Sequence, residues 1–217
     1  MIRYGVLISL WGAWCFLHSF LISPTVTGLV RKRFENGYRY YRLFYNLTAL
    51  ATLIPVSIYT FSLRGQPVFS WEGPLRIVQG MLGIFAMLFF IGGARRYDLA
   101  LFLGIRQIRK QTSCAILTDD CHPDTGGILK MVRHPWYAGG ILIVWSRNLD
   151  VSAILTNLII TLYFIIGAFI EERKLRMEFG EEYIQYQRRV SMLFPLKWII
   201  QHLSEVNKKP NRNPRAN

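Results

Sequence analysis

One short stretch of this sequence holds the residues best suited to chemistry. Residues 125–140 read Thr-Gly-Gly-Ile-Leu-Lys-Met-Val-Arg-His-Pro-Trp-Tyr-Ala-Gly-Gly and continue directly into apolar sequence. Pro135 suits the first turn of a helix, where its missing N–H has no partner to lose and its φ is already helical. Arg133 and His134 therefore come at a helix entrance, beside free N–H groups and the positive end of the helix dipole. Such an end favours a carboxylate or a phosphate.

A second polar block follows thirty-one residues after the first, with apolar sequence between them. Residues 171–180 read Glu-Glu-Arg-Lys-Leu-Arg-Met-Glu-Phe-Gly. Glu172 and Arg176 are i, i+4 partners that support a helix, and Gly180 is a plausible helix stop before a second short helix over residues 181–190. A solvated helix end would carry the same charges. In a helical hairpin, however, the two acids would lie close to Arg133 and His134, and such paired charges suit a zwitterionic ligand.

The elements that position these blocks are apolar and long. The chain has 217 residues, of which 52% are hydrophobic and 18% are charged. A bilayer core of about 30 Å needs roughly 20 helical residues, and four of the five apolar segments reach that length while the fourth is short. The sequence thus predicts an all-α, polytopic membrane protein with about five transmembrane helices, a helical hairpin and a cytoplasmic C-terminal helix. The five segments are residues 4–23, 43–63, 75–93, 136–149 and 151–170.

The net charge of +13 has a topological explanation. Basic residues gather in the segments between the first and second spans, between the third and fourth, and after the fifth, whereas few lie on the other side. The positive-inside rule therefore places the amino terminus outside and the carboxyl terminus in the cytoplasm, with a bacterial inner membrane as the expected location. The basic residues form no motif of a nucleic-acid module, so we expect no nucleic-acid partner.

The first apolar segment, one of its helix faces and the cysteine-containing loop each allow two interpretations. Residues 1–23 have the length of a retained span, although a signal peptide is the alternative. Trp11, Trp14, Cys15 and His18 share one helix face, which could line a site but is better explained as a helix–helix contact. The loop residues Cys114, Cys121 and His122 lack an evident fourth metal ligand, so we expect reduced thiols and no metal site.

The predicted organisation has four parts: amino-terminal transmembrane helices over residues 1–95, a cytoplasmic or interfacial loop over 96–130, a core over 131–200 made of the hairpin and a C-terminal helix, and a disordered basic tail over 201–217. The tail is rich in Lys, Arg, Pro and Asn. Its composition predicts disorder and contact with anionic membrane lipids.

The two polar blocks together resemble the membrane methyltransferases typified by isoprenylcysteine carboxyl methyltransferase and phospholipid methyltransferase. The family pattern is Gly-x-x-x-x-x-Arg-His-Pro-x-Tyr-x-Gly, then Glu-Glu-x-x-Leu-x-x-x-Phe-Gly-x-x-Tyr-x-x-Tyr, then Val and Pro. The amino-terminal part, with residues 17–19 and 41–46, is more similar to methanethiol S-methyltransferases and NnrU-like membrane proteins. The matching positions are Gly127, Arg133, His134, Pro135, Tyr137, Gly139, Glu171, Glu172, Leu175, Phe179, Gly180, Tyr183, Tyr186, Val190 and Pro195.

This resemblance implies S-adenosylmethionine as cofactor, bound at the cytoplasmic end of the hairpin. It implies catalytic roles for Arg133 and Glu172, and a substrate-orienting role for Arg189. The implied cofactor-binding residues are Gly127, Leu129, Lys130, Val132, His134, Tyr137, Gly139, Glu171 and Glu172, with the Gly127–Val132 segment contributing its backbone.

The expected function is methyl transfer to a lipid-like acceptor or to a small thiol or carboxyl group. The sulfonium already activates the methyl group, so the enzyme mainly aligns the reactants and excludes water. The aromatic residues Trp136, Tyr137, Tyr183 and Tyr186 could face the sulfonium or serve as interfacial anchors. Two alternatives are a membrane reductase of the sterol reductase type using NADPH, and a non-catalytic NnrU-like accessory protein.

Overall fold

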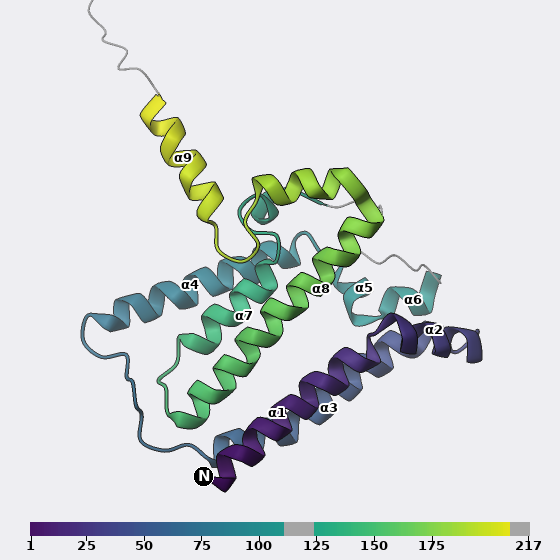
Figure 1. The fold of residues 1–217 in the computed structure, drawn as a ribbon, viewed down its shortest axis with the longest axis horizontal. Helices are drawn as coiled ribbons and strands as arrows, with labels where there is room; N and C mark the ends of the chain where they lie inside the picture. The colour runs from purple at the N-terminus through teal and green to yellow at the C-terminus, as the bar shows by residue number, and fades with distance from the viewer. Residues whose placement is uncertain (111–123, 209–217) are drawn as a thin grey trace, which may run out of the picture.

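The chain folds into a helical bundle. The computed structural model describes residues 1–110 and 124–208, and in these ranges the chain forms no strand, only the isolated bridges Phe69–Leu149 and Val132–Ser191 (Figure 1). The helices, in chain order, are α1 (Ile2–Leu21), α2 (Pro24–Arg33), η1 (Tyr38–Tyr40), α3 (Tyr41–Ser62), α4 (Leu75–Ala94), α5 (Leu99–Leu103), α6 (Ile105–Lys110), η2 (Gly127–Lys130), α7 (Pro135–Trp145), α8 (Val151–Arg189) and α9 (Leu196–Lys208).

Four of these helices, α1, α3, α4 and α8, are long and apolar enough to cross a membrane. They confirm the predicted polytopic all-α fold. The fifth apolar helix, α7, has only 11 residues, about 16 Å at a rise of about 1.5 Å per residue. It ends at Trp145, before the predicted boundary at Leu149, because the segment after it turns and Asp150 caps the next helix by accepting a hydrogen bond from Ala153 N.

The amino-terminal helices α1 and α3 pack along their length, while α4, α7 and α8 form a neighbouring group (Figure 1). The Trp11 indole donates to Thr60 Oγ1 at 3.0 Å, and the Trp14 indole donates to the Ala49 carbonyl at 3.0 Å. The tryptophan stripe of α1 is therefore a helix–helix contact.

The closest packing in the second group joins α4 to α7 through glycines. A Cβ added to Gly93 would lie 2.4 Å from Trp136 Nε1, and one added to Gly139 would lie 3.1 Å from the Ala86 carbonyl. The Trp136 indole donates to the Phe90 carbonyl at 3.2 Å. Small residues thus let two apolar helices approach closely, as is common in membrane bundles.

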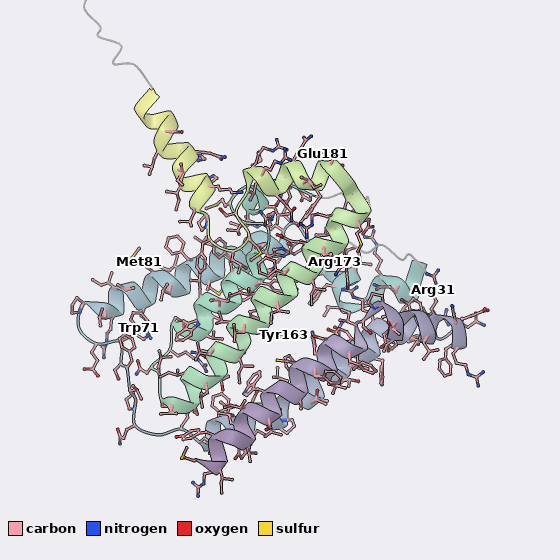
Figure 2. All side chains as sticks on the ribbon, in the orientation of Figure 1. Arg31, Trp71, Met81, Tyr163, Arg173 and Glu181 are labelled. Atoms are coloured by element: carbon pink, nitrogen blue, oxygen red, sulfur yellow. The ribbon has the colours of Figure 1, made fainter. Side chains whose placement is uncertain are left out.

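The helices run alternately between two ends of the molecule. At one end the Trp71 indole donates to the Arg147 carbonyl at 3.0 Å. At the other end Arg42 Nε donates to the Phe102 carbonyl at 3.0 Å. Figure 2 shows Trp71 at the first end, with Arg31 and Glu181 near the second. The loops rich in basic residues therefore share one end of the bundle, and their cytoplasmic placement stays a prediction.

Helix α8 is longer than a bilayer core requires. It has 39 residues and stays regular for about 45 Å before Gly180, longer than a bilayer core of about 30 Å. Gly180 has φ 53° and ψ −129°, backbone angles that residues with a Cβ atom rarely adopt. This confirms the predicted helix stop, and the chain then turns back over η2 (Figure 1).

The last helix, α9, was not predicted as a separate element. It makes residues 201–208 helical, although we assigned them to a disordered tail. The reason is a 3.6-residue apolar period starting directly after Pro195. Its exposed apolar side chains are Leu196, Ile199, Ile200 and Leu203. Residues 209–217 lie outside the described residues.

Candidate active site

A buried ion pair joins the two polar blocks. Arg133 Nε donates to Glu172 Oε1 at 2.6 Å, and Nη2 lies 2.6 Å from the same oxygen. Arg133 Nη1 also donates to the carbonyls of Gln187, at 3.2 Å, and Val190. The side chains of Arg133 and Glu172 are 8% and 6% exposed. The hairpin therefore brings the blocks together as expected, and Glu172 pairs with Arg133 rather than with the predicted partner Arg176.

Every carboxylate oxygen of Glu172 is used within the protein. Oε1 also lies 3.2 Å from His134 Nε2, and Oε2 accepts a hydrogen bond from Gln187 Nε2 at 2.8 Å. A carboxylate accepts only, so His134 Nε2 carries the hydrogen in this contact. Glu172 thus holds Arg133, His134 and Gln187 in place.

Glu171 differs sharply from its neighbour because its side chain is 46% exposed. The Tyr137 hydroxyl donates to Glu171 Oε2 at 3.0 Å, and His134 Nδ1 lies 3.7 Å from the same oxygen. The His134 and Tyr137 rings stack with centroids 5.4 Å apart. Glu171 is accordingly the acid of this cluster that is open to a ligand, with Tyr137 and His134 beside it.

Two aromatic rings stack on the Tyr137 ring. The His134 ring centroid lies 5.4 Å from that of Tyr137, and the Phe164 ring centroid lies 5.3 Å from it with an interplanar angle of 9°. The three rings form a continuous stack from α7 to α8. A cation–π contact of Tyr137 with a sulfonium stays a prediction.

Backbone contacts fix the entrance of α7. Arg133 N donates to the Ser191 carbonyl at 2.9 Å, and His134 N donates to the Met192 carbonyl at 3.1 Å. The Tyr186 hydroxyl donates to the Leu129 carbonyl at 2.7 Å. The chain after Gly180 therefore forms one wall of the cluster, which explains why a helix stop at that residue matters for the site.

The segment leading into η2 is shaped by close approach to Arg96. A Cβ on Gly126 or Gly127 would lie 2.9 Å or 2.7 Å from the Arg96 guanidinium, and Gly127 has φ +52°. Arg96 Nη1 also contacts Asp124 Oδ2 at 3.4 Å. The positive φ of Gly127 favours glycine at this position, and the guanidinium lies directly against the backbone of both glycines.

Tyr97 and helix α5 complete the surroundings of the cluster. Burial raises the pKa of the Tyr97 phenol, and the nearby Glu171 carboxylate raises it further, so this hydroxyl stays protonated. The Tyr97 ring lies edge-on to that of Trp136, with the ring centroids 4.9 Å apart.

Helix α5 is capped by Asp98. The Leu101 N–H, and then Arg106, hold the pKa of Asp98 below its usual range, which keeps this cap charged. The capped helix carries Phe102, whose ring centroid lies 5.0 Å from that of Trp136.

The structure separates several predicted site residues from the cluster. Arg189 is exposed and its Nε donates to the Gln185 carbonyl at 3.3 Å, one turn earlier in its own helix. Gly139 lies at the contact with α4, Lys130 is exposed, and the side chains of Leu129 and Val132 are buried apolar groups. Among the predicted residues, the cluster is formed by Arg133, His134, Tyr137, Glu171 and Glu172.

Gln187 and Tyr97 belong to the surroundings of the site and were not predicted. Gln187 lies four residues after the buried Tyr183, so it shares a helix face with it, and this spacing could have indicated it. Tyr97 gave no comparable signal. Within residues 1–110 and 124–208 no group of three metal-ligating side chains occurs. Cys114, Cys121 and His122 lie outside the described residues.

His18 lies in the other half of the bundle. Its Nε2 is 2.5 Å from the Tyr45 hydroxyl, and its ring stacks on Trp14 at 5.1 Å. Rings then follow one another from His18 through Tyr163 to Phe164, which packs on Tyr137. Figure 2 places Tyr163 midway along α8. His18 thus contributes to packing between α1 and α3 and does not touch the cluster.

Fold and site together define a polytopic helical membrane protein with a charged cluster where its hairpin opens. The NnrU protein family matches residues 6–193. Because this is most of the chain, the protein belongs to the NnrU family, which confirms the resemblance noted from the sequence. No solved structure matches the chain.

Curated relatives match a shorter part of the chain. Methanethiol S-methyltransferase 1 of Bradyrhizobium diazoefficiens is 42% identical over 69 residues, which are 31% of this chain and 24% of that protein. Methanethiol S-methyltransferase of Pseudomonas deceptionensis is 39% identical over 69 residues, 31% of this chain and 26% of that protein. The enzyme of the same name from Crocosphaera subtropica is 33% identical over 72 residues, 33% and 28% of the two chains. The matches span about a quarter of these relatives' length.

Proposed function

We propose that this protein is an S-adenosylmethionine-dependent membrane methyltransferase whose acceptor is a small thiol. The observation that carries the proposal is the pair of adjacent acids with opposite environments. Buried Glu172 is saturated by Arg133, His134 and Gln187, while Glu171 is half exposed beside Tyr137. A rigid buried charge network that supports one accessible carboxylate is the expected construction of a ligand site.

The donor and acceptor groups present fit this cofactor. It carries an ammonium group and ribose hydroxyls, which can donate hydrogen bonds, and the half-exposed Glu171 carboxylate is the accessible acceptor of the cluster. When bound, the cofactor supplies an activated methyl group. Glu171 would hold it, with buried His134 beside this carboxylate and the Tyr137 hydroxyl fixing it by a 3.0 Å hydrogen bond.

The chain's own residues would then act mainly by position. A thiolate is a strong nucleophile and needs no general base once it is ionised. The stacked rings of His134, Tyr137 and Phe164 would exclude water from one side of the reacting groups. The relatives' name, methanethiol S-methyltransferase, favours a thiol over a prenylated or phospholipid acceptor.

The first test measures cofactor binding and turnover together. Purified protein in lipid nanodiscs is titrated with labelled S-adenosylmethionine and then supplied with methanethiol, with dimethyl sulfide measured in the headspace. We expect Glu171→Gln to weaken cofactor affinity about 10- to 100-fold, since a hydrogen bond to a charged group contributes about 1.5–3 kcal/mol. The matched control is Glu178→Gln, an exposed acid in the same helix, which should bind normally.

Other outcomes distinguish the alternatives. Equal affinity of wild type and Glu171→Gln would contradict the site. Binding of NADPH in place of S-adenosylmethionine would support a reductase, and binding of neither would support a non-catalytic role. Cofactor binding with methyl transfer to prenylcysteine analogues or phospholipids, and none to thiols, would retain the cofactor and overturn the acceptor.

A further inference from the structure

A second polar site lies at the same end of the bundle, outside the cluster. A cavity of about 780 Å³ opens between the end of α1, helix α2, η1, the start of α3 and helix α6. Its charged lining consists of Arg31, Lys32, Arg39, Arg42 and a single acid, Glu35. Four cations around one cavity favour an anionic occupant.

The cations of the cavity form no ion pair within the described part of the chain, residues 1–110 and 124–208. Three of the guanidinium groups lie over aromatic rings: the ring centroid is that of Tyr38 at 5.8 Å for Arg31, of Tyr40 at 4.8 Å for Arg39 and of Phe102 at 5.9 Å for Arg42. Arg42 is also fixed through its Nε hydrogen bond to the Phe102 carbonyl.

Tyrosines form the inner wall of the cavity and are themselves anchored. The Tyr41 hydroxyl donates to the Leu21 carbonyl at 2.6 Å, and Tyr45, which is buried, contacts His18 at 2.5 Å. Tyr41, Tyr45 and Arg42 belong to α3, whereas the other basic residues come from α2 and η1. The cavity therefore combines charged groups with anchored aromatic side chains.

This cavity is separate from the proposed methyltransferase site. None of the five cluster residues lines it, and Phe102 and Trp136, with ring centroids 5.0 Å apart, stand between Arg42 and the entrance of α7. A cofactor bearing a sulfonium is disfavoured by four cations. The cavity thus calls for a different ligand, and the inference does not depend on the proposed function.

The position of the cavity indicates where its ligand comes from. It lies where the membrane-spanning helices α1 and α3 end, which is the level of lipid headgroups. Helix α2, which supplies Arg31 and Lys32, also exposes the apolar Leu29, and Phe34 directly follows it and is exposed as well. An interfacial helix with a basic face and apolar side chains is typical of contact with anionic lipid.

We propose that this cavity binds a phosphate group, supplied by the headgroup of an anionic membrane phospholipid. Arg31 and Arg39 would donate charge-assisted hydrogen bonds to the phosphate oxygens, for which the planar guanidinium is well suited. A volume of about 780 Å³ is far larger than a free phosphate needs, and it accommodates a headgroup with its glycerol. Free phosphate shares the binding chemistry and is the other source to be tested.

The experiment compares lipids that differ in charge. Delipidated protein in detergent is titrated with phosphatidylglycerol or phosphatidylcholine, with bound lipid counted by native mass spectrometry and thermal stability followed in parallel. We expect wild type to prefer phosphatidylglycerol by about tenfold or more. The double variant Arg31→Gln/Arg39→Gln should lose this preference. Arg33→Gln, which removes a charge from the same helix but does not line the cavity, should keep it.

Two further arms make the result decisive. Arg39→Lys keeps the charge and should retain most of the preference, which distinguishes an anion site from a structural effect of the substitution. Inorganic phosphate is titrated in the absence of lipid. Stabilisation of wild type by inorganic phosphate alone, lost in the double variant, would assign the site to a soluble phosphate. Equal binding of both lipids by wild type, or an unchanged lipid preference in the double variant, would overturn the proposal.

Discussion

At the scale of single residues, Glu171 and Glu172 are neighbours in sequence that differ in burial and in bonding partners. On a helix, adjacent positions point about 100° apart. This rotation turns Glu172 into the interior beside Arg133, and leaves Glu171 at the edge with Tyr137. One acid is therefore structural in its effect, and the other is available to a ligand.

This division predicts unequal stability effects. Glu172→Ala leaves Arg133 buried without its carboxylate, and removing one partner of a buried pair typically costs about 3–5 kcal/mol. Glu171→Ala loses a half-exposed carboxylate and one hydrogen bond from Tyr137, worth about 1 kcal/mol. Unfolding in mixed detergent micelles measures both. Similar losses for the two variants would show that the Arg133–Glu172 pair does not stabilise the fold.

The sequence was sufficient to predict that Arg133 and His134 lie near the two acids, but it did not predict the individual contacts. Two polar blocks on either side of an apolar hairpin must approach each other, so the proximity of His134 to the acids followed directly. The saturation of Glu172 did not, because Gln187 comes from the chain beyond the Gly180 kink. The exposure of Arg189 could not be predicted for the same reason. Helical periodicity does not encode the direction that a chain takes after a positive-φ glycine such as Gly180.

At the scale of the helices, the contact between α4 and α7 depends on which glycines face a partner. Gly80, Gly83, Gly92 and Gly93 all lie in α4, yet only the last two touch other elements closely. Hydropathy identified this helix correctly, with boundaries within one residue of those observed. It could not assign roles to the glycines, because that depends on Ile128 and Trp136 from distant parts of the chain.

Two alanine substitutions in α4 test this difference. In Gly93→Ala the new methyl group would lie 2.4 Å from Trp136 Nε1, and such overpacking costs about 1–3 kcal/mol. Gly80→Ala meets no atom within 4 Å and should stabilise the helix by about 0.5–1 kcal/mol, because alanine favours helix over glycine. Melting temperatures of the two variants should therefore shift in opposite directions. A stabilising Gly93→Ala would contradict the close contact.

At the scale of the whole molecule, the distribution of charge follows the alternation of the helices. The cluster around Glu172, the basic cavity and the loops rich in Arg and Lys share one end, and the opposite end is formed by the segments around Trp71 and Arg147. Hydropathy predicted the four long helices because burial in lipid leaves a strong apolar signal. It missed α9, whose thirteen residues are too amphipathic and too short to register as a span.

The orientation of the protein in the membrane follows from the concentration of basic residues at one end of the bundle. The positive-inside rule assigns the basic end to the cytoplasm. With Cys15, Cys114 and Cys121 replaced by serine, single cysteines are introduced as Glu72→Cys and Glu181→Cys. Both positions are exposed, and Figure 2 shows Trp71, the neighbour of Glu72 in the chain, and Glu181 at opposite ends. A membrane-impermeant maleimide should label position 72 in intact cells and position 181 only after permeabilisation. The reverse pattern would invert the topology, and labelling of both positions in intact cells would show that they do not lie on opposite sides of a membrane.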